Sequence, residues 1–72
     1  MSRLPESAKL HIEMARLSAE VLMLSASIVE VRANTALTPS EQKAEVSRIE
    51  ANIRGLRSKL SDLEDKLEAL TD

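Results

Sequence analysis

The most constraining feature of this sequence is the number of apolar stripes that each half of the chain would carry as a helix. On a helix, apolar side chains within residues 10–36 recur at alternating steps of three and four along two opposite faces. Residues 42–70 show the same spacing on one face only, and their opposite face is polar. A helix that is apolar on two sides must be covered on two sides, so one intramolecular partner cannot cover the first segment.

One stripe from each segment has the heptad spacing with which two helices bury a shared seam. Two long helices joined by a few residues fold back antiparallel. Antiparallel pairing aligns Val31 with Val46 at one end of the seam and Leu10 with Leu67 at the other, and its midpoint falls next to Thr38. The predicted intramolecular seam consists of Leu10, Met14, Leu17, Val21, Leu24, Ile28, Val31, Val46, Ile49, Ile53, Leu56, Leu60, Leu63 and Leu67.

Local signals set the ends of the two helices. Pro5 suits the first turn of a helix, and the next Gly or Pro in the sequence is Pro39. Thr38 and Glu41 have the spacing of a capping box, which starts the second helix. Gly55 interrupts that helix, either as a tolerated surface glycine or as a point of close approach by another chain. We predict one helical-hairpin domain over 1–72, with helices over about 5–35 and 39–70 and a turn at about 36–38.

The second stripe of the first segment combines alanines, which let helix backbones approach closely, with a few bulky apolar residues. This predicted interface consists of Ile12, Ala15, Ala19, Leu22, Ala26, Val29 and Ala33. The simplest cover is a second copy of the chain, related by a twofold axis near Leu22. The competing cover is an amphipathic helix of another protein. The predicted fold is therefore all-α: an antiparallel helical hairpin, or two-helix coiled coil, that assembles into a four-helix bundle or a larger helical oligomer.

The composition argues against an enzyme. The chain lacks cysteine, phenylalanine, tyrosine and tryptophan, so thiolate metal sites, base-stacking platforms and aromatic ligand pockets are excluded. The lone histidine, His11, has no metal-ligating residue three or four positions away and is expected to be a solvated surface residue. Glu13 and Arg16 have the spacing of an ordinary surface ion pair. We predict no catalytic residues, no metal and no cofactor.

A short basic segment in the second helix is the one polar feature that suggests a ligand. It contains Arg48, Arg54, Arg57 and Lys59, and an oligomer could present it as an anion-binding face. The overall charge of −2, the absence of aromatic residues and the absence of a glycine-rich loop argue against nucleic acid as a partner.

The sequence contains no apolar run of membrane-spanning length and no signal-peptide core, so we expect a cytoplasmic protein without membrane association. The function that fits these features best is that of a non-enzymatic, self-associating protein that binds another protein, as small adaptors, chaperones and inhibitors do. Small bacterial or phage regulators have this size. One alternative is a structural subunit of a larger assembly, and a second is an oligomer that binds nucleic acid or a nucleotide through the Arg48 to Lys59 face.

Overall fold

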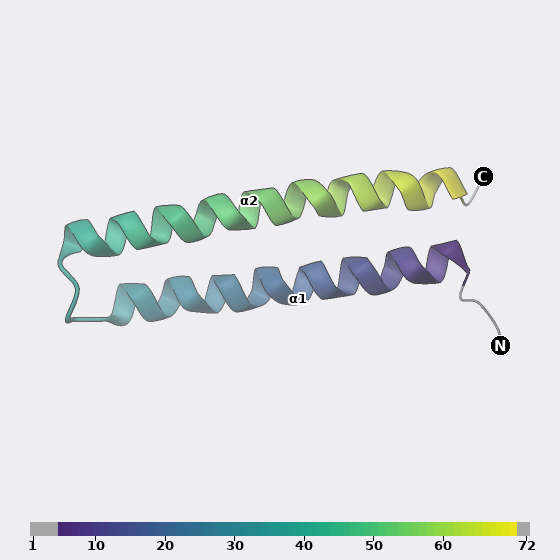
Figure 1. Ribbon diagram of the computed structural model, residues 1–72. Helices are drawn as coiled ribbons and strands as arrows, with labels where there is room; N and C mark the ends of the chain where they lie inside the picture. Colours follow the sequence, from purple (N-terminus) through teal and green to yellow (C-terminus); the bar gives the residue numbers. More distant parts are fainter. Residues whose placement is uncertain (1–4, 71–72) are drawn as a thin grey trace.

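Two long helices form an antiparallel hairpin in the computed structural model, which describes residues 5–70 of the 72-residue chain (Figure 1). Helix α1 spans Glu6–Ala33 and helix α2 spans Pro39–Leu70. The Cα trace extends 52 × 24 × 13 Å, so the hairpin is one helix layer thick. This confirms the predicted all-α antiparallel hairpin, while assembly into a bundle stays a prediction. The ends of the predicted domain, residues 1–4 and 71–72, lie outside the described residues.

Helix α1 ends at Ala33, before the expected boundary at about residue 35. The cause is Asn34, whose backbone is extended, with φ −80° and ψ 100°. The Asn34 Oδ1 atom accepts a hydrogen bond from the backbone N–H of Ala36 at 3.0 Å. A short polar side chain that binds its own following backbone offers the chain an alternative to the helical hydrogen bond, so the connection covers residues 34–38.

The connection is tied to the start of α2 through the Asn34 carbonyl oxygen. This oxygen accepts a hydrogen bond from the Leu37 backbone N–H at 3.3 Å and another from Gln42 Nε2 at 2.8 Å. Gln42 is half-buried and reaches from the first turns of α2 back to the end of α1. Its side chain therefore joins the two helices where the hairpin turns.

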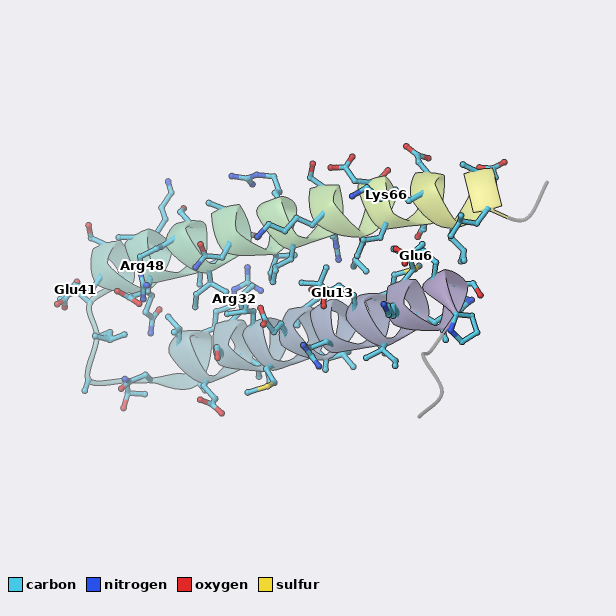
Figure 2. The ribbon with its side chains drawn as sticks, turned by 45° about the vertical axis from the view of Figure 1, so that its right-hand side comes forward. Glu6, Glu13, Arg32, Glu41, Arg48 and Lys66 are labelled. Atoms are coloured by element: carbon cyan, nitrogen blue, oxygen red, sulfur yellow. The ribbon has the colours of Figure 1, made fainter. Side chains whose placement is uncertain are left out.

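Helix α2 begins with the predicted capping box. The Glu41 backbone N–H donates to Thr38 Oγ1 at 3.1 Å, and the Thr38 backbone N–H donates to Glu41 Oε1 at 2.9 Å. Glu41 lies at the start of α2, beside the connection (Figure 2). Hydrogen bonding from the Thr38 backbone N–H, and then from its hydroxyl, holds the pKa of the Glu41 carboxyl below its ordinary value of 4.5. The capping box is confirmed, and it satisfies backbone donors that the first turn leaves free.

The side chains of the predicted seam all lie between the two helices, and each is buried or half-buried. The buried ones are Leu10, Leu17, Val46, Ile49 and Ile53. Even Ile49, which is 6% exposed, is not fully enclosed, because two helices can cover an apolar side chain only from two sides. The hairpin alone thus has a thin core, as expected for a chain of this length.

The two helices pack in the register in which the apolar stripes align. One groove between them is lined by Glu13 and Leu17 of α1 and by residues between 59 and 66 of α2. The aligned register puts residues 60–64 opposite this part of α1, in the middle of the observed range. A slip by one heptad would move the opposing residues by seven positions, out of the centre of this groove.

Candidate interaction surface

The side of α1 that points away from α2 is a continuous apolar surface. We call this surface, defined by the following residues, the α1 outer face. It consists of Ile12, Ala15, Ala19, Leu22, Ala26, Val29 and Ala33, all of which are exposed. Leu22 is 71% exposed, Val29 is 66% exposed and Ile12 is 47% exposed. An apolar side chain exposed singly is ordinary, whereas several that follow one another along a helix mark a contact surface.

Met23 extends this surface beyond what the sequence pattern indicated. The apolar spacing assigns Met23 to neither stripe of α1, and in the structure it is 70% exposed. It follows Leu22 directly, so it borders the α1 outer face on one side. The signal that could have placed it there is its helical position, one residue beyond the stripe, where coiled coils carry residues that flank the contact.

The two polar residues at heptad distance from Met23 have opposite charges. Arg16 precedes it by seven residues and Glu30 follows it by seven, so the three side chains lie along the same edge of the α1 outer face. Arg16 Nη1 approaches Glu13 Oε2 at 3.8 Å, with side chains 70% and 48% exposed. An ion pair this long and this exposed contributes little, so the Arg16 guanidinium keeps most of its capacity for a further partner.

Two serines of α1, Ser25 and Ser27, have hydroxyls that bind their own helix. Ser25 Oγ donates to the Val21 carbonyl oxygen at 2.8 Å, and Ser27 Oγ donates to the Met23 carbonyl oxygen at 3.1 Å. Such bonds to the carbonyl four residues earlier turn the hydroxyl back onto the helix. They satisfy the polar atom locally, so these serines can lie at the border of an apolar contact at little cost.

A groove of about 500 Å³ between the helices adjoins the α1 outer face at Met23. Leu24 and Leu56 contribute apolar surface to it, and Gly55 lies on its α2 side. A Cβ atom added at Gly55 would meet nothing within 4 Å apart from its chain neighbours and the backbone of its own helix, so packing within the hairpin does not require glycine at this position. The groove is an open hollow on the surface of a two-helix layer.

The basic residues of α2 do not form one face. Arg48 and Lys59 line grooves that share Leu24, whereas Arg54 and Arg57 line a groove on the other side of the hairpin, with Ile28. Arg48 Nη2 also makes an ion pair with Glu45 Oε2 at 2.6 Å. The structure thus brings together Arg54 and Arg57 but separates them from the other two. The angular spacing of 3.6 residues per turn already indicated this separation, although the run of positive charges drew attention first.

Other kinds of site find no support in the described part of the chain. Within residues 5–70 no three His, Cys, Asp or Glu side chains gather closely enough to hold a metal ion, and His11 is exposed on α1. Within the same range, neither helix carries a stretch long and apolar enough to cross a membrane.

Comparison of the chain with protein-family models, with curated proteins and with solved structures finds no match. The exposed surfaces of the hairpin and their chemistry are therefore the features that indicate a function. Of these, the α1 outer face departs most clearly from an ordinary solvated helix surface, because large apolar side chains are exposed along it.

Proposed function

We propose that this protein is a non-enzymatic helical-hairpin interaction protein that associates with itself through the α1 outer face and, in that form, binds another protein. The simplest such form is a homodimer in which two hairpins make a four-helix bundle. Adaptors, chaperones and inhibitors work in this way, and the proposal includes a small bacterial or phage regulator.

The observation that carries the proposal is the exposure of Leu22, Met23 and Val29 on one side of α1. Burying apolar surface contributes about 25 cal/mol per Å², and large aliphatic side chains supply most of that area. The hairpin cannot cover these residues itself, because α2 already occupies the opposite side of α1. A second copy supplies a matching apolar face and buries both faces in one contact.

The thin core supports the same proposal. No described side chain is fully enclosed, and two-helix hairpins of this size bury too little surface to be comfortably stable alone. A contact made only by the folded hairpin stabilises the folded state by mass action, because the unfolded chain does not present the α1 outer face. Self-association thus stabilises the hairpin as well as covering the α1 outer face.

The test is the solution mass of the purified protein, measured by light scattering over a tenfold range of concentration. We expect a closed dimer or small oligomer. Leu22→Glu should dissociate it, because the new carboxylate would have to be buried in an apolar contact. Ala44→Glu, which places the same side chain at an exposed position of α2, is the matched control and should leave the mass unchanged.

An oligomer that persists in the Leu22→Glu variant would contradict self-association through this face. A wild-type monomer at every concentration would likewise contradict it and leave the face vacant for a helix of another protein. Growth of the mass with concentration beyond a closed oligomer would instead favour the structural-subunit alternative.

A further inference from the structure

We infer that the occupant of the α1 outer face is a second copy of this chain whose α1 runs antiparallel to the first, with Arg16 of each copy paired with Glu30 of the other. This inference rests on the proposed self-association and adds its direction and register. In this arrangement the twofold axis passes the helices at the level of residues 23–25, and Met23 of each copy lies beside its counterpart.

Charge complementarity is the first support. Arg16, Met23 and Glu30 follow one another at heptad spacing on one edge of the face, so the order along that edge is positive, apolar, negative. Reversing such an edge about its centre places each positive side chain opposite a negative one. Flanking positions of this kind set partner choice and orientation in helix pairs. The edge is therefore complementary to itself only when the helices are antiparallel and centred on Met23.

Size complementarity along the stripe is the second support. In the same register Leu22 lies opposite Ala26 of the other copy, and Val29 lies opposite Ala19. In the central layers Leu22 and Val29 thus each meet an alanine, which keeps the two helix axes at an even separation there and lets the layers interdigitate. Ile12 lies beyond these layers, opposite residue 36, which follows the end of α1. The Ala15 layer meets Ala33 and closes the contact at each end.

Other arrangements lose one or both kinds of complementarity. A parallel pair would put Arg16 next to His11 of the other copy and Glu30 next to Ser25, with no opposite charges in contact. An antiparallel pair shifted by one heptad would put Ile12 opposite Val29 and alanine opposite alanine in the next layer, so the helix separation would have to vary along the contact.

The experiment exchanges the two charges in separate chains. Arg16→Glu and Glu30→Arg each turn both intermolecular ion pairs of a homodimer into like-charge contacts, so the Kd of each homodimer should rise roughly tenfold at low salt. In a mixture of the two variants, every pair regains opposite charges. The heterodimer should therefore form with a Kd within roughly threefold of the wild-type value. Analytical ultracentrifugation gives the Kd, and native mass spectrometry separates heterodimers from homodimers by mass.

Two controls keep the result interpretable. Lys43→Glu and Glu64→Arg make the same changes of net charge at exposed positions of α2 and should leave the Kd unchanged. Arg16→Glu adds a carboxylate near Glu13 and Glu20, so its helicity is checked by circular dichroism. Position 30 has no charged residue three or four positions away, so Glu30→Arg should keep its helix. If Arg16→Glu loses helix, the Kd of the Glu30→Arg homodimer tests the register.

The outcomes separate this inference from the proposed function. Weakened homodimers and a restored heterodimer support the register. Homodimers unaffected by either charge reversal, in a protein that Leu22→Glu does dissociate, would overturn the register while leaving self-association through the face intact. Weakened homodimers without recovery in the mixture would also overturn it. An oligomer insensitive to Leu22→Glu would overturn both.

Discussion

The two helices of this hairpin bury equivalent inner faces but present different outer ones. On the inner side, α1 contributes Leu10 and Leu17 to the buried residues, and α2 contributes Val46, Ile49 and Ile53. On the outer side, α1 exposes several large apolar side chains, whereas the only one exposed on the described part of α2 lies at its last residue, 70. The outer face of α2 is otherwise polar. The two helices therefore share a seam but differ in the apolar surface that they expose to water.

This difference separates the part of the amphipathic pattern that defines the hairpin from the part that the hairpin does not explain. The inner stripes of α1 and α2 match each other and account for the hairpin. The outer stripe of α1 has no counterpart within the chain, so the hairpin fold does not account for it. Ordinary surface residues at those positions would leave the seam unchanged, and the apolar ones therefore indicate a contact outside the hairpin.

The largest expected effect comes from truncating a leucine on each face of α1. Leu17→Ala should lower the free energy of unfolding by about 2–4 kcal/mol, because it removes buried apolar volume from the seam. Leu22→Ala should change the stability of the hairpin by only about 0.5 kcal/mol, because its side chain is 71% exposed. Urea denaturation followed by circular dichroism, at a protein concentration low enough to dissociate any oligomer, measures both.

Equal losses from the two truncations under these dilute conditions would contradict the distinction between the inner and outer faces of α1. At high concentration the comparison changes, because Leu22→Ala should then also weaken self-association and lower the apparent stability. A Leu22→Ala effect that grows with protein concentration, beside a Leu17→Ala effect present at all concentrations, is the expected pattern.

Much of the hairpin could be predicted from the sequence because its determinants are local or periodic. The capping box of Thr38 and Glu41 depends on residues three positions apart, and the seam depends on heptad spacing. The end of α1 was less predictable. Asn34 ends the helix through a local bond of its side chain, but its carbonyl oxygen also binds Gln42 across the turn, and residues eight apart in sequence meet only once the chain has folded back.

The candidate surface shows the same division. The exposed stripe of α1 follows directly from helical spacing, and the structure places each of its residues at the surface. The neighbouring Met23 was not assigned to it, because a residue beside a stripe can turn either toward the seam or away from it. The basic segment was grouped by nearness in sequence, although Arg48 and Arg54 lie on different sides of the hairpin.

A smaller effect is expected from a substitution at Gly55, which tests whether this side of α2 faces water. Gly55→Ala should raise the free energy of unfolding by up to about 1 kcal/mol, because alanine has the higher helix propensity. The added methyl group would meet no atom of α1 within 4 Å. Thermal and urea denaturation measure the change in stability, and light scattering shows whether the oligomer is retained.

The two readouts together sharpen the contrast between the helices. Higher stability with an unchanged oligomer would mean that no other chain contacts the outer side of α2 near Gly55. A weaker oligomer would mean that another chain approaches the groove beside Met23 closely enough to need glycine. Ala51→Gly, at an exposed position one turn earlier, is the reciprocal control and should lower stability by a similar amount of about 1 kcal/mol.

The smallest expected effect concerns the acid end of the pH range and the start of α2. Because Thr38 lowers the pKa of Glu41 from 4.5, the folded hairpin favours the ionised carboxyl. The resulting stabilisation is present above the unfolded-state pKa and is lost as the pH falls through the lower folded-state pKa.

Glu41→Gln keeps an oxygen that can accept the Thr38 N–H but does not titrate, so the stability difference between wild type and variant should shrink between neutral pH and acid. Urea denaturation at a series of pH values measures this difference, with Glu64→Gln as the comparison on the same helix. A difference that stays constant down to acid pH would show that the cap does not depend on the charge of Glu41, and α2 would then begin with a neutral hydrogen bond.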